Sequence, residues 1–239
     1  VWNWEITTHL AKEVKKINPS CLIIFGGPQV PDDDPTFFEK YPFVDIIVHG
    51  EGEIILANIL DAYLKDKDFS KILGLETKNF KNDRQPRIME IGNLPSPYLT
   101  DVIWELTEKN DKIDYLASWE SNRGCPYPCT FCDWGSLTAQ RMSMWDEDRL
   151  YKEIEWFGKN KIAYVDTCDA NFGILREKDL KLAKKFSDTS LKTGFPQRVR
   201  LSWAKFSSDK IIPLAKELQR ANLLRAVTVA LQSLDETTL

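Results

Sequence analysis

The sequence predicts an α/β protein with two successive groups of parallel strands. Short apolar runs, each ending in glycine or polar residues, alternate with stretches whose apolar residues recur at helical spacing. A polar, proline-containing stretch separates an earlier set of these runs from a later set. We therefore expect a first domain over 1–68, a linker over 69–113 and a second domain over 114–239.

The first domain is expected to begin with a helix. Apolar residues recur every three or four positions from Ile6 to Ile17, and Asn18-Pro19 ends the pattern. A short amphipathic piece is expected near 37–41, and a further helix over 53–64.

Two buried strands are expected between these helices, over 21–25 and 44–48. Each strand runs into a glycine-containing turn, Gly26-Gly27-Pro28 after the first and Gly50-Glu51-Gly52-Glu53 after the second. In parallel sheets, ligands bind beyond the carboxyl ends of the strands, where both turns lie.

The stretch 69–113 is polar and irregular, which indicates a linker with a small hairpin around 74–91. Leu94-Pro95-Ser96-Pro97-Tyr98 is expected to be extended, because a residue before proline is biased away from the helical conformation.

The second domain is expected to start with a strand over 114–119 that runs into a cysteine-rich loop. Ser143-Met144-Trp145-Asp146 has the pattern of a capping box. The helix that it starts should carry Leu150 and Phe157 on one face and end near Gly158.

The remaining elements continue the alternation: a strand over 161–166, a helix over 177–186, a strand through Val199, Leu201 and Trp203, a helix over 208–221 and a strand over 226–231. Successive βα units of this kind are typical of a parallel barrel. In such barrels the chemistry lies on loops at the carboxyl ends of the strands.

Composition argues against a nucleic-acid-binding protein and against a membrane-spanning one. The chain has 239 residues and a formal net charge of −4, and no basic run indicates a nucleic-acid surface. No apolar run reaches membrane-spanning length, and five cysteines, three of them in one loop, fit a reducing cytoplasm. The chain starts at Val1 and stops at Leu239, just after a strand-like run, so we expect an internal fragment of a longer protein.

Cys125, Cys129 and Cys132 form a C-x3-C-x2-C pattern, the strongest functional signal in the chain. Three thiolates in so short a loop can face one metal centre, and thiolates are the ligands that a 4Fe–4S cluster takes. Three cysteines would hold three corners of the cluster and leave the fourth iron open to a substrate or cofactor.

Other uses of these cysteines fit less well. A disulfide would leave the third thiol unpaired, and structural zinc would need a fourth ligand, whereas His9 and His49 lie far upstream. An electron-transfer ferredoxin normally supplies four cysteines. An iron–sulfur electron-transfer or sensing module and a zinc-stabilised binding module therefore stay as alternatives to a cluster with an open iron.

The cysteine spacing, with Phe131 just before the last cysteine, resembles the signature of the radical S-adenosylmethionine (SAM) superfamily. The resemblance implies that the open iron binds the amino and carboxylate groups of SAM. It also implies that an electron from the cluster cleaves SAM to a 5′-deoxyadenosyl radical.

The same resemblance suggests the SAM contacts. They are Phe131 near the adenine, Asp169, Ala170 and Asn171 at the ammonium group, Gln232 and Ser233 near the ribose, and Arg200 and Lys205 at the carboxylate. The family often has Gly-Gly-Glu where this chain has Asp-Ala-Asn, so the ammonium contact is not assigned to one group. Trp134 is expected to shield the cluster from water, and Cys168 to be a small buried residue.

The two glycine turns together resemble the C-terminal half of the cobalamin-binding domain that precedes many radical SAM domains. This resemblance covers about residues 1–65 and implies cobalamin contacts from Gly26, Gly27, Pro28, Gly50, Glu51, Gly52 and Glu53. His49 is expected to be a turn residue rather than a cobalt ligand, and His9 a residue of the helix surface. The fold class is then the C-terminal part of a Rossmann-like cobalamin-binding domain followed by a partial (β/α) TIM-like radical SAM barrel.

The resemblance implies an enzyme with a 4Fe–4S cluster, SAM and cobalamin as cofactors. Cobalamin-dependent methyl transfer to an unactivated centre is the expected reaction, and a cobalamin-dependent radical rearrangement or cyclisation is the alternative. The expected partners are a small-molecule or peptide substrate and an electron donor such as flavodoxin or ferredoxin, with no nucleic acid and no membrane.

Overall fold

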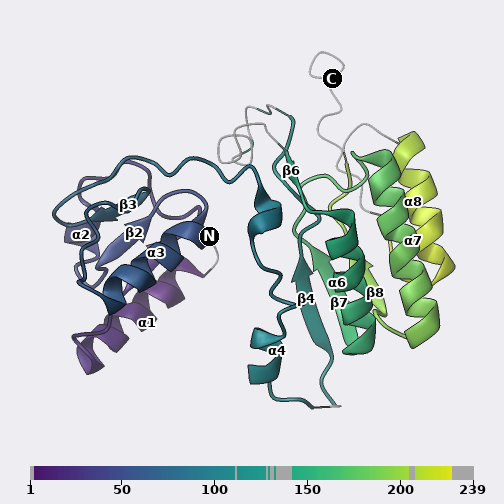
Figure 1. The fold of residues 1–239 in the computed structure, drawn as a ribbon, viewed down its shortest axis with the longest axis horizontal. Helices are drawn as coiled ribbons and strands as arrows, with labels where there is room; N and C mark the ends of the chain where they lie inside the picture. Colours follow the sequence, from purple (N-terminus) through teal and green to yellow (C-terminus); the bar gives the residue numbers. More distant parts are fainter. Residues whose placement is uncertain are drawn as a thin grey trace. The chain divides into compact units, whose positions relative to one another are not determined.

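The computed structural model describes residues 3–110, 112–127, 129, 132, 142–204 and 208–227. The chain divides into two compact units, Val1–Met89 and Glu90–Leu239, which are described separately below. The α/β class predicted from the sequence is confirmed in both units (Figure 1).

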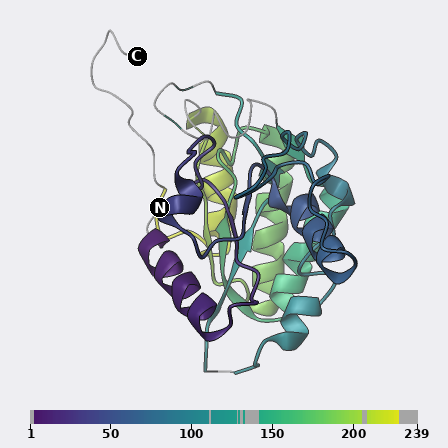
Figure 2. The ribbon, with the colours of Figure 1, turned by 90° about the vertical axis from the view of Figure 1, so that its left-hand side faces the viewer.

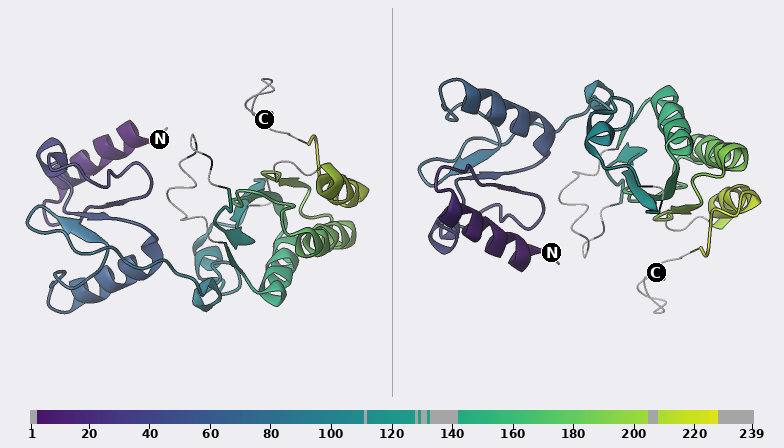
Figure 3. Two further views of the ribbon diagram at one scale, coloured as in Figure 1. Left: turned by 90° about the horizontal axis from the view of Figure 1, so that it is seen from above. Right: turned by 90° about the horizontal axis from the view of Figure 1, so that it is seen from below.

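The first unit is a three-stranded sheet with helices on both faces. Its elements are α1 (Trp4–Ile17), β1 (Ile24–Gly26), α2 (Phe37–Lys40), β2 (Ile46–Val48), α3 (Gly52–Leu64) and β3 (Leu75–Thr77). The strand order is β1-β2-β3, with β1 and β2 parallel and β2 and β3 antiparallel. Helices α1 and α3 cover opposite faces of this sheet (Figures 2 and 3), and each face has its own apolar core.

Helix α1 forms as predicted, but Ala11 is the one residue of the predicted stripe that is buried. Ile6, Leu10 and Ile17 are 61%, 57% and 85% exposed, whereas Ala11 is buried. Trp4 anchors the start of the helix, with its ring edge-on to Phe25 at a centroid separation of 5.5 Å. Periodicity therefore identified the helix correctly without identifying the face that packs.

The stretch expected to be a linker contributes a strand to the first sheet. Leu75 of β3 is fully buried, and β3 pairs with β2 in the register Ile46↔Thr77. An isolated bridge between Glu76 and Lys81 closes the small hairpin expected in this region. Residues up to Met89 thus belong to the first compact unit, which differs from the expected boundary at residue 68.

The second unit is a parallel sheet with a small antiparallel ribbon. Its elements are η1 (Ile91–Asn93), α4 (Val102–Leu106), β4 (Tyr115–Trp119), β5 (Asn122–Arg123), β6 (Ser143–Met144), α6 (Glu147–Lys159), β7 (Ile162–Thr167), α7 (Arg176–Thr193), β8 (Arg198–Arg200) and α8 (Ser208–Arg220). Strands β4, β7 and β8 are parallel neighbours in that order, and β5 pairs with β6.

Buried apolar side chains join the helices of the second unit to its sheet. Leu150 and Phe157 of α6, Phe186 of α7 and Leu214 of α8 are each at most 1% exposed. Alternate residues of β7 are buried, among them Val165, as expected for a strand with one face against helices. The helices α6, α7 and α8 lie along the same side of the three strands (Figure 3).

Helix α6 begins later than the predicted capping box. Asp146 is the N-cap, and its carboxylate accepts hydrogen bonds from the backbone N–H of Asp148 (2.9 Å) and Arg149 (3.2 Å). Ser143 does not cap the helix, because it pairs with Arg123 in the ribbon of β5 and β6. The helix continues to Lys159, so Gly158 lies inside its last turn.

Two further expectations concern the end of the chain and membranes. The strand expected over 226–231 lies mostly outside the described residues, which stop at Val227. Every helix in the described ranges is too short or too polar to cross a lipid bilayer.

Candidate active site

The cysteine segment follows β4 and β5 in the second unit. Cys125 is buried, whereas Cys129 and Cys132 are partly exposed, and all three have free thiols. The backbone N–H of Cys132 donates to the carbonyl oxygen of Cys129 at 3.1 Å. Gly124 has φ of +108°, a conformation that an L-residue rarely adopts, so glycine is needed at the entrance to the segment.

The turn after β7 lies against this cysteine segment. Asn171 is buried, and its side-chain Nδ2 donates to Sγ of Cys125 at 3.1 Å. The Asn171 Oδ1 atom is also buried, and it has no hydrogen-bond partner within the described part of the chain. An unpaired buried acceptor is costly unless a ligand or water satisfies it. This pair therefore brings together two of the segments that the sequence singled out.

Asp169, from the same turn, binds the residues that precede the cysteines. Its Oδ1 accepts hydrogen bonds from the backbone N–H of Ser121 (2.7 Å) and of Asn122 (3.1 Å), and its Oδ2 accepts from the Ser121 hydroxyl (2.5 Å). Burial raises the pKa of Asp169 from 3.8 to about 6, and the hydrogen bonds from Ser121 and Asn122 oppose that rise. Ala170 is partly buried between Asp169 and Asn171.

Helix α7 supplies two further charged side chains near this turn. Lys178 Nζ donates to the carbonyl oxygens of Ser121 (3.1 Å) and Trp145 (3.2 Å), and burial lowers the pKa of Lys178. Asp179 accepts hydrogen bonds from the backbone N–H of Gly173 (2.8 Å) and Leu175 (3.0 Å). Burial raises the pKa of Asp179 from 3.8 to about 6.

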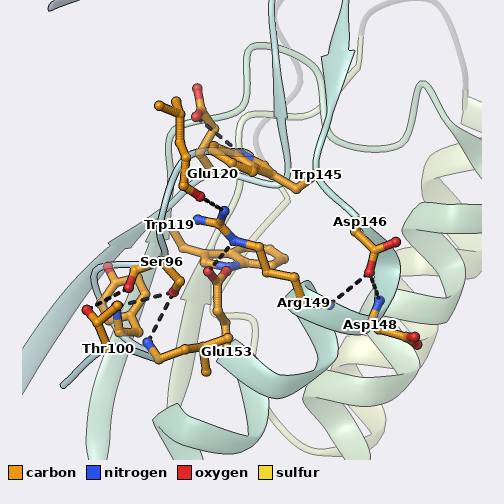
Figure 4. Close-up of polar contacts among 12 residues, drawn as sticks. Ser96, Thr100, Trp119, Glu120, Trp145, Asp146, Asp148, Arg149 and Glu153 are labelled. Atoms are coloured by element: carbon orange, nitrogen blue, oxygen red, sulfur yellow. Dashed lines mark hydrogen bonds and ion pairs between the residues drawn. The ribbon is translucent and has the colours of Figure 1, made fainter. Parts of the chain in front are cut away.

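A buried ion pair supports the end of β4 from the helix side (Figure 4). Arg149 Nε donates to Glu153 Oε1 at 2.9 Å, and Glu153 Oε2 accepts from the indole N–H of Trp119 at 2.8 Å. Arg149 also donates to the carbonyl oxygen of Leu94 at 2.5 Å, and its guanidinium lies 3.8 Å from the centroid of the Trp145 ring. The strand that leads to the cysteines is thus tied to α6 and to residue 94.

A second polar contact ties the same strand end to the ribbon. The Trp145 indole N–H donates to Glu120 Oε2 at 3.3 Å, and Arg123 donates to the same carboxylate at 3.0 Å. Figure 4 shows Trp145 between Glu120 and Arg149. These contacts fix Arg123, which lies two positions before Cys125 in the sequence.

Other predicted site residues lie elsewhere or cannot be placed. Arg200 is exposed, and its guanidinium makes a two-point ion pair with Asp166 (Nε–Oδ1 2.7 Å, NH2–Oδ2 2.5 Å). Cys168 is exposed, so the expectation of a buried residue was wrong: it alternates with Thr167 and Asp169, whose side chains are buried. The predictions for Phe131, Trp134, Lys205, Gln232 and Ser233 fall outside the described residues.

In the first unit, the two glycine turns follow β1 and β2 as expected. Gly27 and Gly50 have φ of +90° and +91°, and Gly52 begins α3. No described atom lies within 4 Å of a Cβ added at Gly27, Gly50 or Gly52, so a ligand can approach the backbone closely there. Gly26 is the last residue of β1, and Pro28 follows Gly27 in the first turn.

The acidic and histidine side chains of these turns already have partners. Glu51 accepts a hydrogen bond from the backbone N–H of Ile88 at 2.5 Å, and Glu53 lies in the first turn of α3. His49 is buried, with Nε2 at 2.8 Å from Glu76 and Nδ1 at 3.6 Å from Asp32. Both ring nitrogens of His49 thus lie beside carboxylates.

Sequence reasoning missed several residues that shape the site. Ser121 and Lys178 belong to no recognisable motif, and only the tertiary structure reveals their roles. Glu153 could have been found from the sequence, because it is an acidic residue on the apolar face of α6, between Leu150 and Phe157. A charged side chain on a buried face is rarely left without a partner, so its position predicts a buried contact.

Comparison with known proteins identifies relatives over nearly the whole chain. No family model matches. The chain is 38% identical to 2-(S-pantetheinyl)-carbapenam-3-carboxylate methyltransferase of Streptantibioticus cattleyicolor, over 98% of this chain and 35% of the relative. It is also 38% identical to the cobalamin-dependent radical SAM methyltransferase TokK of Streptomyces tokunonensis, over the same shares. The chain therefore spans about a third of the length of these relatives.

A solved structure has a similar fold. The radical SAM methyltransferase TsrM from Kitasatospora setae, with cobalamin and a [4Fe-4S] cluster bound, matches with a TM-score of 0.60 over 91% of this chain and 43% of that protein. The sequence identity is 16%, so this likeness concerns the fold alone.

Proposed function

Because this chain belongs to the cobalamin-dependent radical SAM enzymes, we propose that Cys125, Cys129 and Cys132 hold a 4Fe–4S cluster whose fourth iron binds SAM. The donor set fits this cluster, since all three cysteines are free thiols and the segment follows the carboxyl end of a parallel strand. When bound, the cluster supplies the electron that reductively cleaves SAM.

The contact between Asn171 and Cys125 is the observation that carries this proposal. Asn171 donates to the sulfur of Cys125, while its Oδ1 stays buried and unpaired among the described residues. A ligand with N–H donors placed beside the cysteines would satisfy that oxygen, and the ammonium group of SAM is such a ligand. We therefore assign the ammonium contact to Asn171 in the first place, with the backbone of Ala170 beside it.

The remaining SAM contacts are proposed from the family resemblance. Phe131 would lie near the adenine, and Gln232 and Ser233 near the ribose. Arg200 is a weaker candidate for the SAM carboxylate, because its guanidinium is paired with Asp166. In this proposal the second unit is part of a TIM-like radical SAM barrel.

We propose that the first unit is part of a Rossmann-like cobalamin-binding domain. The open backbone at Gly27, Gly50 and Gly52 supports this, because a large planar cofactor needs close approach to the main chain. Gly26, Pro28, Glu51 and Glu53 would line the same two turns. His49 is not proposed as a cobalt ligand, since both of its ring nitrogens lie beside carboxylates.

The proposed reaction is cobalamin-dependent methyl transfer to an unactivated centre of a small molecule. The names of the two methyltransferases to which the chain is 38% identical support methyl transfer. An electron donor such as flavodoxin or ferredoxin would reduce the cluster. In this proposal the chain's residues have three tasks: holding the cluster, orienting SAM through Asn171, and fixing the cysteine segment against the turn after β7.

Product analysis tests this function. The anaerobically reconstituted and reduced protein, given SAM labelled in its methyl group and cobalamin, should form 5′-deoxyadenosine or S-adenosylhomocysteine. Label appearing in an added substrate would identify methyl transfer, whereas 5′-deoxyadenosine with an unlabelled, altered substrate would identify rearrangement or cyclisation. A cluster-replete protein that forms neither SAM product would favour the electron-transfer module.

A further inference from the structure

Ser121 is held from two sides at the point where the chain leaves β4 for the cysteine segment. Asp169 accepts its backbone N–H at 2.7 Å and its hydroxyl at 2.5 Å, while Lys178 donates to its carbonyl oxygen at 3.1 Å. Ser121 is completely buried and Asp169 is 2% exposed. The backbone N–H, the hydroxyl and the carbonyl oxygen of Ser121 therefore all form hydrogen bonds. Each of these three hydrogen bonds has the ionisable side chain of Asp169 or Lys178 as its partner.

The same short turn holds the cysteine segment at a second point. Asn171, two residues after Asp169, contacts the sulfur of Cys125, four residues after Ser121. Two side chains of one turn thus bind two places in one segment. Such a two-point attachment fixes where the cysteines lie relative to Asn171, the proposed contact for SAM.

We propose that Asp169 is a positioning residue, which fixes the cysteine segment against the turn after β7 and does not receive the ammonium group of SAM. This proposal rests on the proposed function, because it assigns a role within the same cluster and SAM site. It departs from the resemblance, which placed Asp169 and Asn171 together at the ammonium.

The contacts of Asp169 argue for positioning. Both of its oxygens already accept hydrogen bonds from Ser121 or Asn122, and almost none of its surface is exposed. Asn171 Oδ1, by contrast, is buried without a partner in the described ranges.

Two substitutions at Asp169 separate positioning from direct contact. Asp169→Asn can keep its Oδ1 as the acceptor for the two backbone N–H groups, while its Nδ2 donates to the Ser121 oxygen. Asp169→Ala loses all of these hydrogen bonds. A positioning role needs only the hydrogen bonds, whereas a contact with an ammonium group also needs the negative charge.

The first measurement is SAM binding to the anaerobically reconstituted protein, with the SAM-induced change in the electron paramagnetic resonance spectrum of the reduced cluster. We expect Asp169→Ala to weaken SAM binding about tenfold and to diminish the spectral change. Asp169→Asn should stay within about twofold of the parent. Asp188→Ala, at an exposed acidic residue of α7, serves as the control and should change nothing. Equal weakening in the Asn and Ala variants, or no change in either, would overturn the proposal.

The second measurement needs no cluster, so it separates this proposal from the proposed function. In the apo protein Cys125 is buried, and its alkylation by iodoacetamide, followed by peptide mass spectrometry, reports whether the segment is held. Alkylation of Cys125 should be at least about fivefold faster in Asp169→Ala and nearly unchanged in Asp169→Asn, with Cys21 of the first unit as internal reference. An unchanged rate in the Ala variant would refute the positioning role even if the parent protein binds no cluster. A parent without a cluster would refute the proposed function alone.

Discussion

Replacing Arg149 with methionine tests how strongly the buried ion pair holds the strand that leads to the cysteines. The change removes the guanidinium that binds Glu153 and the Leu94 carbonyl oxygen. It also removes the cation–π contact of that guanidinium with the Trp145 ring. The Glu153 side chain is 4% exposed, so its carboxylate would be left buried, with the Trp119 indole as its one remaining donor among the described residues.

The expected loss of stability follows from this geometry. Removing one partner of a buried pair costs about 3–5 kcal/mol, because the other charge stays buried without compensation. The Arg149 side chain is 15% exposed, so some water can reach the pair and the lower end, about 3 kcal/mol, applies. In a domain of this size that corresponds to a fall in melting temperature of about 6–12 °C.

The effect should depend on Glu153, which a double-mutant cycle measures. In Glu153→Gln the amide oxygen can still accept from Trp119, but the charge is gone. Arg149→Met should therefore cost at least about 1 kcal/mol less in the Glu153→Gln background than in the parent. Lys184→Met, which removes an exposed pair with Asp188 on α7, is the matched control and should cost at most about 0.5 kcal/mol.

Urea unfolding followed by circular dichroism and tryptophan fluorescence would give these free energies for each variant. If Arg149→Met costs no more than Lys184→Met, the ion pair with Glu153 does not stabilise the strand that leads to the cysteines. Strict additivity of the Arg149 and Glu153 substitutions would show that the two side chains do not interact.

Three further predictions follow from single positions. The pKa of Asp179 rises from 3.8 to about 6 on folding, so its stabilising contribution is complete below the unfolded pKa and is lost as the pH rises to about 6. Between about pH 4 and pH 6 the free energy of unfolding, measured by urea titration, should therefore fall by up to about 3 kcal/mol less in Asp179→Asn than in the parent. Gly74→Ala should destabilise the first unit by about 1–3 kcal/mol in thermal unfolding, because φ is +74° and the new Cβ would lie 2.6 Å from a buried isoleucine. Gly52→Val should weaken hydroxocobalamin binding in equilibrium dialysis with little change in melting temperature, since its Cβ meets no described atom.

Each of these predictions has a control and a contrary outcome. A pH dependence that is the same in Asp179→Asn and the parent would show that this carboxyl does not titrate as argued. Gly194→Ala has a similar φ of +81° with open space around it, so an equal cost there would leave no role for the close contact at Gly74. Gly92→Val, equally open but in the second unit, should leave cobalamin binding unchanged. Equal weakening by Gly52→Val and Gly92→Val would count against the glycine turns as the cobalamin site.

Local patterns predicted those parts of the fold that local chemistry determines. Apolar periodicity identified α1 and α6, and apolar runs ending in turns identified β2 and β7. The rule that loops gather at the carboxyl ends of parallel strands anticipated that Asn171 and Cys125 meet, although 46 positions separate them.

The features that were missed depend on contacts between distant residues. The expected hairpin around 74–91 supplies β3, but its pairing with β2 was missed, because β3 buries Leu75 alone and so has no apolar run. The two-residue strand β6 draws Ser143 into a ribbon and displaces the cap to Asp146. Ser121 is an ordinary serine in the sequence, and its importance arises only from what surrounds it.

Iron and electron paramagnetic resonance analysis of the reconstituted protein tests whether the three cysteines hold a cluster that binds SAM. The parent protein should contain about four irons per chain, absorb broadly near about 400 nm, and change its reduced spectrum when SAM is added. Replacing Cys125, Cys129 and Cys132 together with alanine should abolish all three properties, whereas Cys21→Ala in the first unit should leave them intact. A full cluster in the triple variant would show that these cysteines are not its ligands, and a cluster in the parent that does not respond to SAM would show that its fourth iron does not bind SAM.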